Sequence, residues 1–127
     1  TRRSSDLMTG MILDFKANKA RMAVAAGGGY ATATDLADWL VQKLNIPFRE
    51  AHHIAGAAVK LAETNGVELT QLTLKQYKAL HPGVTADVYR VLTPAASAAS
   101  RVSYGGTAPA QVRLQIARWK GLLHAAT

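Results

Sequence analysis

Apolar residues recur every three or four positions along most of the chain, which is the spacing of one face of an α-helix. Alternating runs of β-branched residues, which indicate strands, are missing from the sequence. Alanine, leucine, lysine and glutamine dominate the periodic segments, and these are strong helix formers. We therefore expect an all-α fold, in which the end of a long central-bundle helix precedes a small helical C-terminal domain of short antiparallel helix pairs.

The first segment carries a narrow apolar stripe, whose spacing is typical of the seam of a helix packed lengthwise in a bundle. The stripe consists of Met8, Met11, Phe15, Asn18, Met22 and Ala25, and Ile12 widens it. The consecutive glycines Gly27, Gly28 and Gly29 then end the helix and form a flexible corner. This corner predicts two units, the end of a long bundle helix at residues 1–29 and a small helical domain at residues 30–127.

Capping residues and a proline delimit two helices after the glycine corner. The first begins near Thr32 or Thr34, whose hydroxyls can cap free amide groups, and ends before Asn45-Ile46-Pro47. The second follows this proline and ends at Asn65-Gly66. Its inward stripe is rich in small side chains, which predicts close contact between helices: Ala51, Ile54, Ala55, Ala58, Val59 and Ala62.

Shorter helices are predicted in the rest of the chain. One follows Thr73 and stops at His81-Pro82-Gly83, and another is capped by Thr85 and continues to Thr93-Pro94. The alanine- and serine-rich residues 95–100 are interpreted as a further helix. After a glycine turn at residues 104–106, Thr107 is expected to cap a final helix. One face of that helix is formed by Val112, Ile116, Trp119 and Leu123.

The composition excludes several classes of protein. The 127 residues contain no cysteine, so disulfide frameworks, zinc fingers, iron–sulfur sites and cysteine nucleophiles are excluded within them. No apolar run approaches the roughly 20 residues of a membrane span, and residues 1–10 make a poor signal peptide. We therefore expect a soluble, cytoplasmic protein without a membrane partner.

The net charge of +7 invites a nucleic-acid interpretation, but the excess lies at the two ends of the chain. Residues 31–100 hold six basic and six acidic side chains, whereas residues 101–127 hold four basic and no acidic ones. The alternative is a basic helix-turn-helix module, with residues 47–65 and 73–80 as its helices and Lys75, Gln76 and Lys78 on the second. The neutral middle argues against it, so we expect no nucleic-acid partner.

Residue chemistry alone predicts no active site, metal site or cofactor site. His52 and His53 are adjacent, so on a helix they point about 100° apart and cannot chelate one metal. We expect one of them at a buried edge, with a backbone or carboxylate partner. Arg49 with Glu50, and Asp35 with Asp38, have the composition of local ion pairs and helix-end charges. A second hypothesis for Arg49 is a bidentate bridge to a neighbouring element.

The remaining histidines and glycines are interpreted as turn and tail residues. His81 precedes a proline and His124 lies near the C-terminus. Gly105-Gly106 lacks both a Walker lysine and the glycine spacing of a dinucleotide motif, so it is interpreted as a turn. We assign no catalytic, metal-binding or cofactor-binding residue from these patterns.

Three stretches, in this order, closely resemble the C-terminal part of argininosuccinate lyase. They are Ala31-Thr32-Ala33-Thr34-Asp35-Leu36-Ala37-Asp38-Trp39-Leu40-Val41, Pro47-Phe48-Arg49-Glu50-Ala51-His52 and Ser103-Tyr104-Gly105-Gly106-Thr107-Ala108-Pro109. The segments at residues 72–74 and 87–92 also look like that family, so the resemblance covers residues 4–120.

The resemblance implies a member of the fumarase and aspartase superfamily that cleaves argininosuccinate to arginine and fumarate, the last step of arginine biosynthesis. It implies no organic cofactor, and a homotetramer built around long helices whose active sites draw on more than one subunit. Residues 4–26 look like the last stretch of such a helix. The implied partners are the rest of the lyase chain and its other subunits. A lens δ-crystallin shares the same pattern and stays an alternative within the family.

The chain also departs from the family pattern. The signature loop Gly-Ser-Ser-x-Met-Pro-x-Lys-x-Asn is absent, and Ser4-Ser5-Asp6-Leu7-Met8 lacks its proline and lysine. In the family, the serine base, the threonine–histidine segment and the substrate-binding lysine belong upstream of Thr1. We therefore carry over no catalytic residue and expect a C-terminal fragment, inactive alone, that would meet argininosuccinate only in the complete enzyme.

The methionine-rich seam of the first segment also predicts an interaction. An exposed seam of Met8, Met11, Phe15 and Met22 would form an apolar patch larger than monomers usually tolerate. We therefore expect self-association through the first helix, or refolding of this helix onto the domain.

Overall fold

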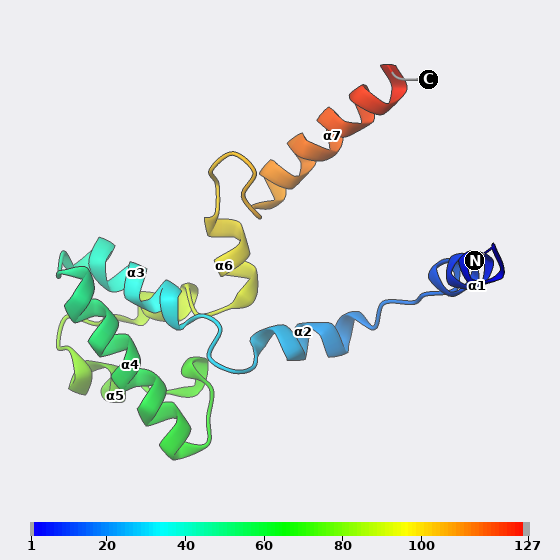
Figure 1. Cartoon of the computed structure of the whole chain (residues 1–127). Coiled ribbons are helices and arrows are strands. Elements are labelled where there is room, and N and C mark those ends of the chain that lie inside the picture. Colours follow the sequence, from blue (N-terminus) through cyan, green and yellow to red (C-terminus); the bar gives the residue numbers. More distant parts are fainter. Residues whose placement is uncertain (1, 126–127) are drawn as a thin grey trace.

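The computed structural model describes residues 2–125 of the chain, and all of its regular elements in this range are helical (Figure 1). This confirms the all-α fold. The elements are the α-helices α1 (Arg2–Leu13), α2 (Lys19–Gly27), α3 (Ala33–Leu44), α4 (Phe48–Asn65), α5 (Leu74–Leu80), α6 (Pro94–Ser100) and α7 (Pro109–Ala125), and the 3₁₀-helices η1 (Leu69–Gln71) and η2 (Ala86–Arg90). No helix in this described range is long and apolar enough to cross a membrane.

The pair formed by α3 and α4 is the centre of the core. The stripe predicted for α4 is confirmed, because Ala51, Ala55, Ala58 and Ala62 are all buried. These small side chains let α3 approach closely, and Leu36, Leu40 and Trp39 of α3 fill the contact. The connection at residues 45–47 is short, so the two helices are antiparallel neighbours.

The segment from η1 to η2 closes the other side of this core. Tyr77 of α5 is buried, and its hydroxyl donates to the carbonyl of Leu69 at 2.9 Å. The Tyr89 hydroxyl donates to the carbonyl of Leu72 at 2.7 Å. The two rings meet edge to face, with centroids 6.0 Å apart. The buried phenol of Tyr77 and the partly buried phenol of Tyr89 therefore each have an acceptor for the hydroxyl proton.

The first segment differs from its prediction, because it forms two helices instead of one. Helix α1 ends at Leu13 and α2 begins at Lys19, so Phe15 and Asn18 lie outside both. The Asn18 side chain accepts a hydrogen bond from the backbone N–H of Arg21 at 3.1 Å. An asparagine inside a helix competes with the helix in this way, and within the described residues no side chain of α2 is buried, so packing does not compensate for the lost turn.

The predicted helix boundaries are confirmed where they depend on local backbone conformation or local capping. Asn45 and Gly66 end α3 and α4 with φ angles of 53° and 62°, in the left-handed region that favours glycine and asparagine. Thr73 caps α5 in a reciprocal capping box with Gln76.

Two threonine caps were predicted wrongly. Thr32 precedes α3, but its hydroxyl donates to the carbonyl of Leu92 at 3.3 Å. It therefore makes a tertiary contact and no capping hydrogen bond to α3. Thr85 makes no side-chain cap, and the residues after it form the 3₁₀-helix η2 instead of an α-helix.

Helix α7 extends away from the α3–α4 core beyond α6 (Figure 1). Residues 95–100 are helical, as predicted. The turn at Gly105-Gly106 is also confirmed, and Gly105 has a φ of 76°. A third predicted cap, Thr107, is also wrong, because its hydroxyl donates to the carbonyl of Ala98 at 3.0 Å and α7 begins two residues later at Pro109. The apolar face of α7 is exposed, in contrast to the buried stripe of α4: Val112, Ile116, Trp119 and Leu123.

Candidate functional site

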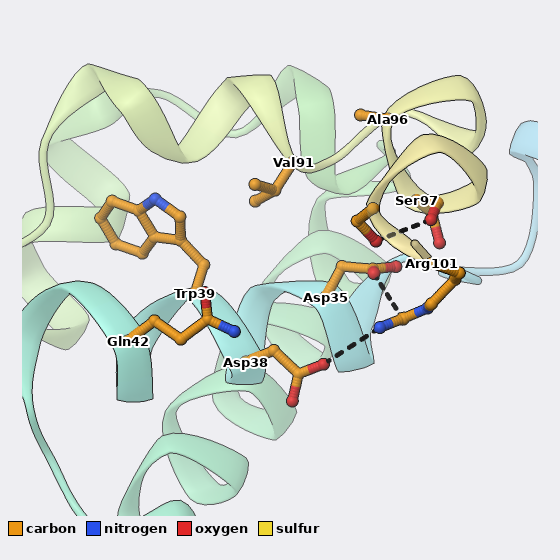
Figure 2. A pocket seen from close by; sticks show the side chains of 9 residues that line it. Asp35, Asp38, Trp39, Gln42, Val91, Ala96, Ser97 and Arg101 are labelled. Carbon is orange, nitrogen blue, oxygen red and sulfur yellow. Dashed lines mark hydrogen bonds and ion pairs between the residues drawn. The ribbon is translucent and has the colours of Figure 1, made fainter. Parts of the chain in front are cut away.

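A pocket of about 190 Å³ lies between the outer side of α3 and the α6 region (Figure 2). Helix α3 contributes two acidic side chains, an amide and an indole, and the other wall contributes two serines and a guanidinium. The lining residues are Asp35, Asp38, Trp39, Gln42, Val91, Ala96, Ser97, Ser100 and Arg101.

An ion-pair network crosses this pocket. Asp35 and Asp38 are three residues apart in α3 and therefore share a face of the helix. Nη2 of Arg101 donates to Oδ1 of Asp35 at 2.7 Å, and Nη1 lies 3.6 Å from Oδ2 of Asp38. Asp35 lies in the first turn of α3, where the helix dipole also favours a negative charge. One arginine therefore joins α3 to the end of α6.

The carboxylate of Asp35 depends on this arginine. The side chain is only 7% exposed, and its Oδ2 is buried without a hydrogen-bond partner in the described part of the chain. A buried carboxylate without a cation would be strongly unfavourable. The pair is no acid–base couple, because a guanidinium keeps its proton in proteins. The geometry therefore indicates a positioning role, not proton transfer.

The backbone of Arg101 fixes the beginning of α7. Its carbonyl oxygen accepts a hydrogen bond from the N–H of Ala108 at 3.2 Å. Gly106 packs so closely against the same carbonyl that a Cβ at this position would overlap it. The side chain of Arg101 thus holds α3 while its main chain holds the loop that leads into α7.

The candidate residues near the start of α4 lie on its exposed outer face. Both His52 and His53 are exposed, so the expected buried histidine is wrong. The buried face of α4 passes through Ala51 and Ala55, and the two histidines follow Ala51 at about 100° and 200° around the helix. The imidazole of His52 lies beside the ring of Phe48, with centroids 6.1 Å apart. Arg49 is exposed, and within the described residues it forms no bridge to another element.

The other histidines occupy a turn and a helix end, as expected. Nδ1 of His81 accepts from the N–H of Gly83 at 3.2 Å, and His124 lies in the last turn of α7. In the part of the chain that the structure describes, no group of three or more His, Cys, Asp or Glu side chains is placed to hold a metal ion.

Comparison with known proteins identifies the family. Residues 30–99 match the family described as argininosuccinate lyase C-terminal, which is more than half of the chain. The chain belongs to this family. The resemblance of the stretches that include residues 31–41 and 47–52 is thereby confirmed. The match begins before α3 and ends within α6, so it includes both acidic residues of the pocket and stops before Arg101.

A solved lyase shares the fold of this family member. The chain is similar to a variant of EDDS lyase with bound fumarate, with a TM-score of 0.76 and 32% sequence identity. The similarity covers 85% of this chain but 23% of the EDDS lyase chain. The chain therefore spans less than a quarter of the length of that relative, and belongs to a lyase-type family.

The helix-turn-helix alternative does not agree with the geometry. Helices α4 and α5 are joined by residues 66–73, which include η1, whereas that motif uses a turn of roughly three or four residues. Lys75 and Lys78 are exposed, but the Gln76 side chain accepts from the N–H of Thr73 in the capping box. Of the three polar side chains predicted for the recognition helix, one is therefore already engaged in a hydrogen bond within the chain.

Sequence reasoning missed Arg101, the partner of the two acidic residues. Asp35 and Asp38 were interpreted as local ion pairs and helix-end charges, but their partner is 66 residues from Asp35. One signal was available, because Trp39 and Gln42 occupy the positions four residues after the two acids, where a local cation would stand. Two acids on one helix face without such a cation indicate a distant partner.

Proposed function

We propose that this chain is the C-terminal region of an argininosuccinate lyase, which cleaves argininosuccinate to arginine and fumarate by β-elimination in arginine biosynthesis. The observation that carries the proposal is the family match over residues 30–99, which includes the whole α3–α4 core. The similarity to EDDS lyase, a relative solved with fumarate, supports a reaction that releases fumarate.

In this proposal the chain itself is an assembly piece. A β-elimination needs a base beside a carboxylate and groups that stabilise the resulting aci-carboxylate. We propose that the rest of the lyase supplies these groups, and that residues 2–125 supply packing and the Asp35–Arg101 link. The chain alone is expected to be inactive, and the complete enzyme is expected to be a cytoplasmic homotetramer.

A complementation experiment tests the proposal. An argininosuccinate lyase and, separately, EDDS lyase are shortened so that each lacks its C-terminal region, and the 127-residue chain is produced together with each of them. Fumarate release from argininosuccinate and from EDDS is measured for the chain, each shortened lyase and each mixture. We expect release only from the mixture with the shortened argininosuccinate lyase, because the chain should fit the surfaces of its own type of enzyme.

A variant with a disrupted core provides the control. Leu40 is fully buried between α3 and α4, so Leu40→Asp places a charge in the core and should abolish complementation. Rescue of the shortened EDDS lyase instead of the shortened argininosuccinate lyase would overturn the assignment to argininosuccinate lyase. Release by the purified chain alone, above a heat-inactivated control, would overturn the assembly role.

A further inference from the structure

A second cavity, a groove of about 290 Å³, lies on the outer side of the α3–α4 pair and is almost entirely apolar. Ala37 and Asp38 of α3 form one wall, while Phe48, His52 and Gly56 of α4 form the other. Asp38 lines both this groove and the pocket described above, so it is the charged residue at their common edge.

The groove is open because its floor lacks large side chains. Gly56 has no side chain, and a Cβ built there would meet no atom within 4 Å. Phe48 stands at the edge with 61% of its surface exposed. An exposed aromatic ring beside an empty apolar groove is typical of a binding surface for another apolar group.

Helix α7 carries a side chain that fits this groove. Trp119 is 57% exposed, and the guanidinium carbon of Arg118 lies 5.8 Å from its ring centroid. Nη1 of Arg118 donates to the hydroxyl of Tyr104 at 2.6 Å, which holds the arginine beside the indole. Tryptophan and arginine are the residues most often found at the energetic centres of protein interfaces.

Size and charge match between the two surfaces. Because a cavity of about 150 Å³ accommodates benzene, a groove of about 290 Å³ has room for an indole. Asp38 is half exposed, and its contact with Arg101 is long at 3.6 Å, so it can accept a hydrogen bond from a second cation. Helix α7 has arginines and a lysine but no acidic residue, so nothing on it opposes Asp38.

In the same copy of the chain, α7 does not lie over this groove. Figure 1 shows α7 leading away from α3 and α4, with α6 between them. We propose that the groove between α3 and α4 binds Trp119 and Arg118 of a second copy of this chain. Because each copy carries both surfaces, two copies bind reciprocally about a two-fold axis.

A groove-filling variant tests this interaction. Gly56→Leu fills the groove from within and replaces a helix-interior glycine by a better helix former, so it does not endanger the fold. Ala57→Leu is the matched control, because Ala57 is exposed on α4 and does not line the groove. Trp119→Ser removes the inserting side chain from the other surface. The oligomeric state of the full chain is measured by sedimentation equilibrium over a wide concentration range.

The expected result is a monomer–dimer equilibrium for the native chain and for Ala57→Leu. In Gly56→Leu and in Trp119→Ser the dissociation constant should rise about tenfold or more. A native chain that stays monomeric overturns the proposal. An association that both variants leave unchanged but Met11→Asp abolishes also overturns it and assigns the contact to α1. The readout is mass, so it is independent of whether the lyase proposal holds.

Discussion

Helices α4 and α7 have apolar stripes of the same helical spacing but opposite surroundings. The stripe of α4 is buried against α3, whereas Ile116 and Trp119 of α7 are at least half exposed. Helices α1 and α2 resemble α7, because Met11 and Met22 are also exposed. The periodic pattern therefore determines that a face is apolar, but the presence of a partner within the chain determines whether it is buried.

The connections explain which helices find such a partner. Helix α4 follows α3 after only residues 45–47, so closing their contact costs little chain entropy. Helix α7 follows α6 after residues 101–108, and these residues are fixed through Arg101 in a direction away from the core. The exposed stripes are consistent with surfaces that meet other lyase chains.

The largest expected effect comes from shortening a leucine in the packed region. Leu40 of α3 is 0% exposed, and Leu7 of α1 is 70% exposed. Leu40→Ala should lower the free energy of unfolding by about 3 kcal/mol, because the deletion removes buried methyl groups and leaves a cavity. Leu7→Ala should change it by less than about 0.5 kcal/mol. Urea unfolding followed by circular dichroism measures both.

Equal effects of the two leucine variants would contradict this comparison. A large cost for Leu7→Ala at high protein concentration only would show that α1 is buried in an assembly. A dilution series of the same unfolding experiment separates these outcomes, since stability gained from association depends on concentration.

The sequence predicted the packed region better than the exposed one. The alanine stripe, the Asn45 and Gly66 ends and the Thr73 cap depend on contacts between residues close in the chain, so local patterns contain them. The break after Leu13 was missed because a heptad-like stripe predicts a seam whether or not a second helix is present to stabilise it.

The candidate site was predicted less completely than the core. Asp35 and Asp38 were recognised as charged helix residues, but their common partner lies at the far end of α6. Spacing along one helix contains no information about a side chain 66 residues away. Likewise, the exposure of His52 depends on which face of α4 packs against α3. The stripe of small residues predicts that face but does not show how far around the helix the contact extends.

The second prediction concerns the two kinds of ion pair. Arg101→Met leaves the buried Asp35 carboxylate without its cation and should destabilise the protein by about 2 kcal/mol. Arg90→Met is the matched control, because Arg90 and Asp87 are both mostly exposed and 3.4 Å apart. It should cost less than about 0.5 kcal/mol. The same unfolding experiment, repeated at low and high salt, tests whether salt weakens only the exposed Arg90–Asp87 pair and leaves the contribution of the Arg101–Asp35 pair unchanged.

The third prediction concerns Tyr77, whose burial raises the pKa of the phenol well above its usual value of 10.0. Because this pKa is raised in the folded state, the unfolded chain ionises first, so stability is complete below pH 10 and decreases above it. Tyr77→Phe removes the hydrogen bond to Leu69 and should cost about 1 kcal/mol at neutral pH. The difference in unfolding free energy between native protein and variant should shrink above pH 10. A difference that stays constant would contradict this assignment.

The smallest effect compares two threonines that the sequence presents as equivalent helix caps. The Thr73 hydroxyl accepts from the N–H of Gln76 at 3.3 Å, while Thr85 forms no cap. Thr73→Ala should therefore destabilise by about 1 kcal/mol, because a free amide at the start of α5 loses its acceptor. Thr85→Ala should change the free energy of unfolding by only a few tenths of a kcal/mol, since η2 is held by backbone bonds such as that from Val88 to the Thr85 carbonyl. Thermal unfolding of both variants in parallel resolves this difference. Equal losses would mean that Thr85 contributes a bond outside the cap, whereas a loss confined to Thr73 locates the contribution in the capping box of α5.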